Sequence, residues 1–239
     1  MSDQAKYLLI DIGNSRIKYA LVSEGQEDLA VLHCVHTTEL TQIIKQVAKV
    51  LVASVGKTLL VEELQSLCQQ HKVECQLIHT QAQQFGIHCA YEQFTTMGVD
   101  RWLAILAARK ITLLPVAIVD LGTANTCDIV IENQHIGGWI APGFNLMKQG
   151  LLANTQKVFA DNNVSHHLSL GVSTPECVNL GCLAAVQGLV LMAESTLAKY
   201  ATSYEILITG GDQNLITDLK QPYLHYFPNL VLLGLMRFI

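Results

Sequence analysis

The chain has 239 residues, half of them apolar and 15% charged, and its formal net charge is −5. It contains no run of basic residues, which argues against general nucleic-acid binding. No uninterrupted apolar stretch reaches the roughly 18 residues of a transmembrane helix, so we expect no membrane span. The seven cysteines form no Cys-x-x-Cys pair, and the first residues resemble no secretory signal. These features predict a cytoplasmic protein with reduced thiols.

The first half of the chain is predicted to alternate strands with helices. Strands are indicated by apolar runs that stop at turn residues, and helices by apolar side chains that recur every three or four residues. The expected elements are strands at 6–12 and 16–23, helices at 38–50 and 59–71, a strand at 73–79, and a helix from Arg101 to about Lys110.

The second half follows a similar alternation. An apolar strand ends at Asp120, and a glycine-rich turn is expected at 137–143. A long helix is predicted at 174–200, with Pro175 in its first turn, where the missing N–H costs little. A further strand at 205–212 runs into a Gly-Gly turn. Strands that alternate with helices predict an α/β fold.

One segment of the sequence occurs twice. Residues 11–22 read DIGNSRIKYALV, and residues 120–131 read DLGTANTCDIVI. Each copy follows an apolar run and places an Asp at the strand end, a Gly two residues later, and then a small polar residue, Asn14 or Thr123. The copies lie 109 residues apart, close to half the chain, which predicts a duplicated fold. The two halves are expected to span residues 1–115 and 116–239, with the boundary near 112–116.

The repeated turn suggests phosphate binding. Gly13 and Gly122 let backbone N–H groups approach a ligand closely, and successive N–H groups form an anion-binding concavity. The carboxylates of Asp11 and Asp120 can hold a cation that neutralises a phosphate, and Mg²⁺ prefers few carboxylates together with waters and phosphates. Two ordinary hairpins with Asp and Gly in their turns would also fit. Repetition at half-chain spacing favours phosphate-binding loops.

Three further features have both a functional and a structural interpretation. Asp100 and Arg101 are adjacent at a predicted helix start. Asp100 would accept a proton while Arg101 binds an anionic group, or Asp100 would simply cap the helix N-terminus. Gly210 and Gly211 follow an apolar strand, where they would let a ring or ribose lie against the backbone or would form an ordinary turn. Lys18 would point at phosphates or would be an exposed strand lysine.

Taken together, these motifs resemble a known family. DIGNSRIK, GVDRW, DLGTANTCD, GGWIAPG, STPE and TGGD occur in the order and spacing of type III pantothenate kinases, over nearly the whole chain. That family belongs to the actin-like ATPase superfamily, so the resemblance implies an α/β fold of two duplicated ribonuclease-H-like halves with a cleft between them. It also implies ATP-dependent phosphorylation of pantothenate to 4′-phosphopantothenate, the first step of coenzyme A biosynthesis.

The resemblance further implies roles for individual residues. It implies that Asp100 is the general base, that Asp11 lies near Mg²⁺, and that Asp120 is associated with a monovalent cation, K⁺ or NH₄⁺. The residues that it implies for ATP and phosphate binding are Asp11, Gly13, Asn14, Lys18, Gly122, Thr123, Gly210 and Gly211. Those that it implies for pantothenate binding are Tyr91, Gly98, Arg101 and Thr174.

The resemblance also implies a homodimer whose substrate pocket lies near the subunit interface. One departure concerns Asn154, which occupies a position where some relatives carry a histidine. A histidine contact to the substrate across the dimer is therefore in doubt here, although an asparagine can still donate a hydrogen bond.

Two other functions are compatible with parts of this pattern. One is a different small-molecule kinase of the same superfamily, acting on a sugar or an acid, against which the GVDRW motif argues. The other is a catalytically idle regulator. Against that alternative, all three acids that the reaction would need, Asp11, Asp100 and Asp120, are present.

Overall fold

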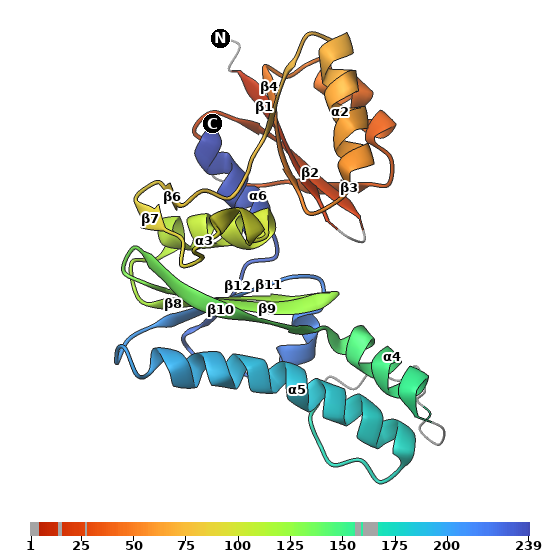
Figure 1. The fold of residues 1–239 in the computed structure, drawn as a ribbon, viewed down its shortest axis with the longest axis vertical. Helices are drawn as coiled ribbons and strands as arrows, with labels where there is room; N and C mark the ends of the chain where they lie inside the picture. Colours follow the sequence, from red (N-terminus) through yellow and green to blue (C-terminus); the bar gives the residue numbers. More distant parts are fainter. Residues whose placement is uncertain (1–4, 14–15, 27, 156–158, 160–166) are drawn as a thin grey trace. The chain divides into compact units, whose positions relative to one another are not determined.

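The computed structural model describes residues 5–13, 16–26, 28–155, 159 and 167–239. It divides into two compact units (Figure 1). The first comprises Met1–Ala107 and Asn229–Ile239, and the second comprises Ala108–Pro228. The C-terminal segment thus returns to the first unit, where Arg237 Nη1 donates a hydrogen bond of 2.7 Å to the Leu106 carbonyl. The halves expected from the repeat, 1–115 and 116–239, stay a prediction.

The first unit contains a five-stranded sheet with the order β3-β2-β1-β4-β5. The strand β1 pairs antiparallel with β2, and β2 pairs antiparallel with β3, whereas β4 and β5 run parallel to β1. The strands are β1 (Lys6–Ile12), β2 (Ile17–Ser23), β3 (Val31–Cys34), β4 (Lys49–Ser54) and β5 (Glu74–Leu77). A short antiparallel pair, β6 (Gln83–Gln84) and β7 (Ile87–His88), follows them.

Helices cover this sheet on both faces. On one face, α1 (Thr41–Ile44) and α2 (Thr58–Gln70) bury alternate residues of β1, namely Leu8, Ile10 and Ile12. On the other face, α6 (Leu230–Leu235) lies against β1 and β4. The helix α3 (Val99–Ile111) follows the short 3₁₀ turn η2 (Phe94–Thr96). Because side chains alternate along a strand, Asp11 lies on the face opposite the α2 cluster.

The second unit repeats this arrangement strand for strand. The strands of its own residues have the order β10-β9-β8-β11-β12 within a sheet to which β7 and β6 also belong, with β9 and β10 antiparallel and β11 and β12 parallel. The strands are β8 (Val116–Leu121), β9 (Ala124–Ile131), β10 (Gln134–Pro142), β11 (Glu205–Thr209) and β12 (Leu224–Tyr226). The prediction of an α/β fold with a repeated unit is therefore confirmed.

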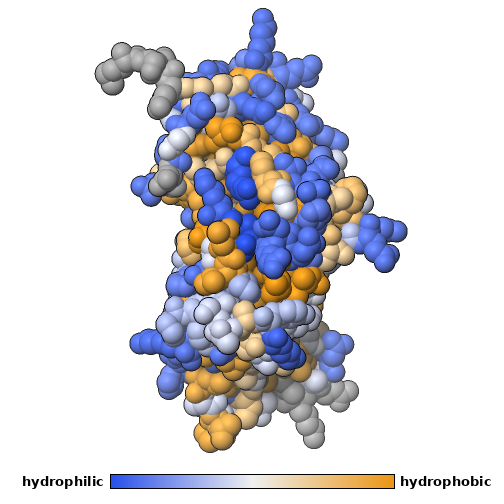
Figure 2. Space-filling model, turned by 90° about the vertical axis from the view of Figure 1, so that its left-hand side faces the viewer, coloured by the Kyte–Doolittle hydropathy of each residue, from blue (hydrophilic) through white to orange (hydrophobic). Residues whose placement is uncertain are grey.

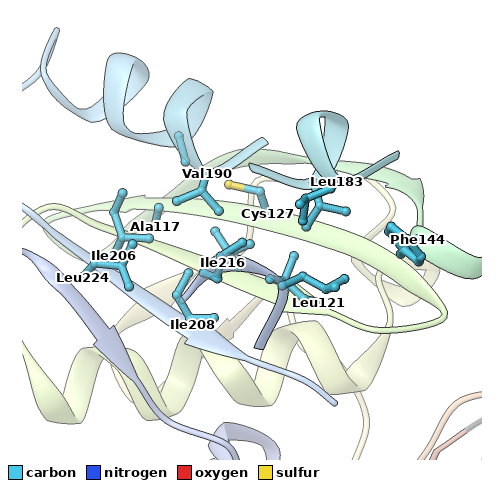
Figure 3. Close-up of a cluster of buried hydrophobic side chains, with 14 of the residues drawn as sticks. Ala117, Leu121, Cys127, Phe144, Leu183, Val190, Ile206, Ile208, Ile216 and Leu224 are labelled. Carbon is cyan, nitrogen blue, oxygen red and sulfur yellow. The ribbon is translucent and has the colours of Figure 1, made fainter. Parts of the chain in front are cut away.

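One long helix, α5 (Thr174–Leu197), covers a face of the second sheet, and α4 (Phe144–Asn154) precedes it. Figure 3 shows the core beneath α5, where Leu183 and Val190 pack on Leu121 and Cys127. By length and composition alone α5 would be able to span a membrane, but the buried core helix of a folded protein passes the same test, so this is weak evidence for a membrane span. Half of its most apolar window is buried within the protein, as befits a core helix.

Two local predictions were wrong. The helix expected at 38–50 is limited to the 3₁₀ turn η1 (Thr37–Leu40) and α1, and Lys49–Ser54 forms the central strand β4. The run KVLVAS is buried on both faces, so its apolar residues fit either period. The turn expected at 137–143 is mostly the end of β10, which pairs with β9 up to Pro142 and has a register shift between His135 and Gly137.

Candidate active site

The first acidic hairpin joins β1 to β2. Asp11 lies directly opposite Lys18 in this antiparallel pair, so both side chains project from the same face of the sheet. Asp11 is 9% exposed and Lys18 is half-buried. The Gly13 N–H donates a hydrogen bond of 3.2 Å to the Arg16 carbonyl and closes the turn. Asn14 lies outside the described residues.

The second acidic hairpin joins β8 to β9. Asp120 lies opposite Thr126 and, like Asp11, projects from the face opposite the main helix, because Val119 and Leu121 point into the core under α5. Thr123 is exposed in the turn. The two carboxylates therefore occupy equivalent places at the ends of equivalent strands, as the repeat predicted.

The Gly-Gly turn after β11 lies against the second hairpin. Gly210 has a φ of +96°, and a Cβ added there would lie 2.5 Å from Asp120 Oδ1, so neither the backbone nor the space accepts a side chain. Gly211 beside it is exposed. The Asp212 N–H donates a hydrogen bond of 2.9 Å to the Leu121 carbonyl. Burial raises the pKa of the Asp212 carboxyl group.

The first turn of α3 holds the third carboxylate. Asp100 is the second residue of the helix, and its Oδ1 accepts a hydrogen bond of 2.8 Å from the Arg101 N–H. A carboxylate is stabilised at this end of a helix. Gly98 immediately precedes the helix, and a Cβ there would lie 2.5 Å from Asp100 Oδ1. Gly98 thus leaves the room in which the Asp100 carboxylate sits.

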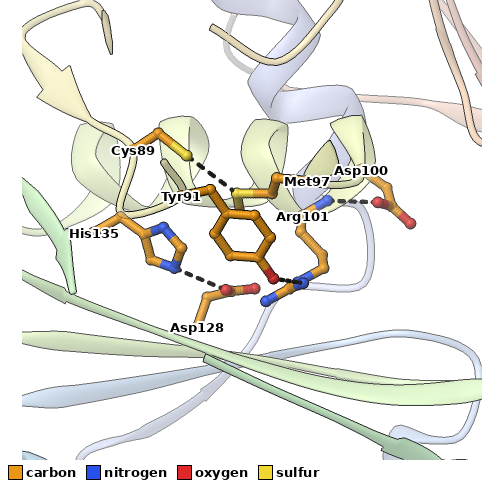
Figure 4. A network of polar contacts seen from close by, with 7 residues as sticks. All are labelled: Cys89, Tyr91, Met97, Asp100, Arg101, Asp128 and His135. Atoms are coloured by element: carbon orange, nitrogen blue, oxygen red, sulfur yellow. Dashed lines mark hydrogen bonds and ion pairs between the residues drawn. The ribbon is translucent and has the colours of Figure 1, made fainter. Parts of the chain in front are cut away.

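Two of the residues predicted to bind substrate contact each other. Arg101 Nη1 donates a hydrogen bond of 3.0 Å to the Tyr91 hydroxyl, and its guanidinium carbon lies 5.8 Å from the centre of the Tyr91 ring (Figure 4). Arg101 is only 7% exposed. Tyr91 therefore helps to fix the orientation of this buried guanidinium group, whose planar shape is typical of groups that bind carboxylates.

A cavity of about 370 Å³ opens beside Gly98 within the first unit. It is lined by the end of β4 and by residues 79–81 and 94–99. The Ser54 hydroxyl is buried at this cavity and has no hydrogen-bond partner among the described residues. The sequence analysis missed Ser54, since a single serine at a strand end carries no distinctive signal.

The fourth predicted substrate residue, Thr174, is the exposed first residue of α5 in the second unit. It lines a groove of about 630 Å³ together with Leu151, Val172 and Cys177. Asn154, at the end of α4, donates its side-chain N–H to the Gly150 carbonyl at 2.8 Å. As the structure describes it, the Asn154 amide group is engaged within its own helix.

A buried polar pair in the second unit was also missed. His135 Nε2 lies 2.9 Å from Asp128 Oδ1 between β10 and β9, and both side chains are almost fully buried (Figure 4). The signal in the sequence is an Asp that interrupts the apolar run CDIVI. Paired buried groups of this kind hold strands together, and we assign the pair no catalytic role.

The described residues contain no group of three His, Cys, Asp or Glu side chains that could hold a metal ion by themselves. Asp11 and Asp120 each provide one carboxylate at the end of the first strand of their hairpin. This arrangement fits Mg²⁺, which takes one or two carboxylates and completes its shell with waters and substrate phosphates.

Comparison with known proteins places these residues in a family. A sequence model of type III pantothenate kinase matches residues 7–194. A type III pantothenate kinase of Pseudoalteromonas atlantica is 46% identical over 100% of this chain and 99% of its own length.

Among solved structures, a Campylobacter jejuni protein assigned to the Baf family superposes with a TM-score of 0.61, at 21% identity over 96% of each chain. A Sinorhizobium meliloti protein assigned as a 2-dehydro-3-deoxygalactonokinase gives a TM-score of 0.63, at 10% identity over 97% of each chain. At such low identities these two show a common fold alone.

Proposed function

Because this chain belongs to the type III pantothenate kinase family, we propose that Asp100 is the general base of the reaction that defines that family. The reaction is the ATP-dependent phosphorylation of pantothenate to 4′-phosphopantothenate, which begins coenzyme A biosynthesis. The full-length match at 46% identity is the observation that carries this function. The chain is accordingly a kinase with an alcohol as acceptor.

Phosphoryl transfer depends mainly on positioning and on neutralising charge. In the proposed mechanism Asp100 accepts the proton of the primary hydroxyl of pantothenate while the hydroxyl oxygen attacks the γ-phosphorus of ATP and ADP leaves. The position of Asp100 supports this role, because the Arg101 N–H donates to its carboxylate and fixes the orientation of that group at the start of the helix.

We assign pantothenate binding to Tyr91, Gly98, Arg101 and Thr174. The contact between Tyr91 and Arg101 supports this assignment for two of them, because it orients a buried guanidinium group toward an anionic or carbonyl oxygen. The cavity beside Gly98 supplies a polar space next to the start of α3. It contains the Ser54 hydroxyl, which has no hydrogen-bond partner among the described residues.

We assign the phosphates of ATP to the two hairpins, through Gly13, Asn14 and Lys18 in the first and Gly122 and Thr123 in the second. Lys18 stands opposite Asp11 and would contribute a positive charge there. Gly210 and Gly211 would hold the adenosine side, where the bare backbone lets a flat group approach.

Asp11 would hold Mg²⁺ and Asp120 a monovalent cation, K⁺ or NH₄⁺. The ions would neutralise the charge that develops on the transferred phosphoryl group. The two acids differ in their cross-strand partners, because Asp11 has a lysine opposite it in the sheet, whereas Asp120 has a neutral threonine.

We also propose that the protein is a cytoplasmic homodimer whose substrate pocket lies near the subunit interface. The second unit exposes apolar side chains close to Thr174, since Leu170 is 95% and Val172 is 92% exposed. Figure 2 shows hydrophobic side chains exposed near the bottom of the view. Apolar side chains of this kind are typical of an interface.

A coupled assay of ADP release tests the proposal. With Mg²⁺ and K⁺ present, ADP should form only when pantothenate is added, and mass spectrometry should find one added phosphoryl group on pantothenate. Omitting K⁺ should lower the rate. A chain that hydrolyses ATP at the same rate without pantothenate, or that phosphorylates a sugar in its place, would contradict it.

A further inference from the structure

Gly143 connects the second acidic hairpin to α4. Its N–H donates a hydrogen bond of 3.0 Å to the Thr123 carbonyl, in the turn of the hairpin. Its own carbonyl accepts a hydrogen bond of 2.9 Å from the Met147 N–H, in the first turn of α4. The residue is the last glycine of the motif GGWIAPG.

Position 143 has no space for a side chain. A Cβ there would lie 2.6 Å from the Thr123 carbonyl oxygen and 2.9 Å from the Thr123 carbonyl carbon, and it would overlap the Gly122 carbonyl oxygen. These are backbone atoms, which cannot move aside by changing a rotamer. The dihedral angles of Gly143, φ −70° and ψ 170°, are open to any residue. Glycine is therefore required here by the close approach of the turn and not by backbone conformation.

The contact also orients the turn. The carbonyl groups of Gly122 and Thr123 face Gly143. Because a trans peptide unit is planar, the N–H groups that follow these carbonyls, those of Thr123 and Ala124, point away from Gly143. Both residues are exposed in the segment that joins β8 to β9.

We propose that Gly143 is a positioning residue for ATP. It sets the second hairpin turn so that the N–H groups of Thr123 and Ala124 can donate to a phosphate. This inference rests on the proposed role of Gly122 and Thr123 in phosphate binding. Gly143 contacts the turn of the second hairpin and not the nucleotide. Ala124 joins Thr123 as a second backbone donor to the phosphate.

The test compares Gly143→Ala with Gly188→Ala, a helical glycine in α5 around whose Cβ position nothing lies within 4 Å. Steady-state rates are measured while ATP and pantothenate are varied in turn. Gly143→Ala should raise the KM for ATP about tenfold, the loss expected for one or two hydrogen bonds to a charged phosphate. The KM for pantothenate should stay within about twofold, and Gly188→Ala should match the wild type in both constants.

A merely structural role would give a different result. Partial unfolding lowers the active fraction, and hence kcat, but leaves both KM values unchanged. That outcome, or a proportional rise in both KM values, would overturn the proposal.

If Gly143→Ala does not fold, Asn125→Ala decides the question. The Asn125 side-chain N–H donates to the Pro142 carbonyl at 3.4 Å and ties the end of β10 to the start of β9. Its loss should raise the KM for ATP about threefold, and an unchanged KM would overturn the proposal. A wild-type chain without pantothenate-dependent ADP release would instead refute the proposed function itself.

Discussion

The two acidic hairpins have the same place in their units but different surroundings. Each lies between the first two strands of its unit, the five strands of each unit follow an equivalent order, and each carboxylate projects from the face opposite the main helix. Asp11 has Lys18 opposite it, whereas Asp120 has Thr126. The second turn is enclosed by two glycines, Gly143 and Gly210, that no side chain can replace without moving backbone or the carboxylate.

This difference shows how a duplicated scaffold can acquire two functions. The repeated hairpin keeps an acid at the end of its first strand, and the residue opposite that acid in the second strand sets the local charge. A lysine opposite Asp11 suits contact with phosphates, while the threonine opposite Asp120 adds no charge there.

The largest effect is expected at the acid that lies outside the repeat. Asp100→Asn should lower kcat by about 10²–10⁴-fold, the usual contribution of a general base. The KM for ATP should stay within about twofold, because Asp100 is not assigned to the nucleotide. Steady-state kinetics provides the measurement. The control variant is Asp28→Asn, which removes an exposed acid elsewhere in the chain. Near wild-type turnover by Asp100→Asn would remove Asp100 from this role.

The cross-strand partners of the two carboxylates should differ in importance. Lys18→Met should lower kcat/KM for ATP about 10- to 100-fold, since a charged donor to phosphate is lost. The matched change Thr126→Val in the second hairpin should cost less than about threefold, as it removes only a neutral hydroxyl. Initial rates at varied ATP measure both. Equal losses would show that the hairpins are functionally alike.

A further prediction concerns the contact between Tyr91 and Arg101 in the first unit. Arg101→Lys should raise the KM for pantothenate about tenfold, because lysine lacks the planar set of donors. Tyr91→Phe should raise it by about two- to fivefold, through loss of the hydrogen bond that orients Arg101. Rates at saturating ATP with pantothenate varied give these values. A rise in the KM for ATP instead would mean that the pair serves the nucleotide.

The smallest effect is expected on stability, and it concerns the segments that follow the equivalent strands β4 and β11. Three residues beyond each strand end stand Lys57 in the first unit and Asp212 in the second. Burial disfavours the charged form of Asp212 and raises its pKa in the folded state. Its contribution to stability is therefore most favourable below its unfolded pKa, and it is lost as the pH rises through the folded pKa.

Asp212→Asn, which stays neutral, should be more stable than the wild type at neutral pH. The gain should be less than about 1 kcal/mol, since the group is partly exposed to screening water. It should shrink as the pH falls toward about 4. Denaturant unfolding at several pH values measures this difference. A variant whose stability parallels the wild type at every pH would contradict the argument.

Much of this fold could be predicted from the sequence because the repeat is local. The strand–turn–strand pattern around Asp11 and Asp120 needs only neighbouring residues, and the equivalent strand orders of the two sheets confirm it. The segment at 38–50 was misread because a strand buried on both faces has no alternation to distinguish it from a helix. Residues 137–143 were misread because a strand rich in glycine resembles a turn.

The site was less accessible to prediction where it depends on contacts between distant segments. The hydrogen bond between Tyr91 and Arg101 joins a loop to a helix, and the contacts of Gly143 and Gly210 with the second hairpin join strands far apart in sequence. The motifs indicated that glycines matter at these points. They did not indicate that steric exclusion by backbone or by a carboxylate is the physical reason.

The most direct test of the division between the two hairpins is the dependence of activity on each cation in Asp11→Asn and Asp120→Asn. Half-activating concentrations of Mg²⁺ and K⁺ are measured for both variants and the wild type. Asp11→Asn should raise the Mg²⁺ requirement and leave the K⁺ requirement unchanged, and Asp120→Asn should do the reverse. Equal shifts in both requirements for both variants, or an exchange of the two patterns, would contradict the account.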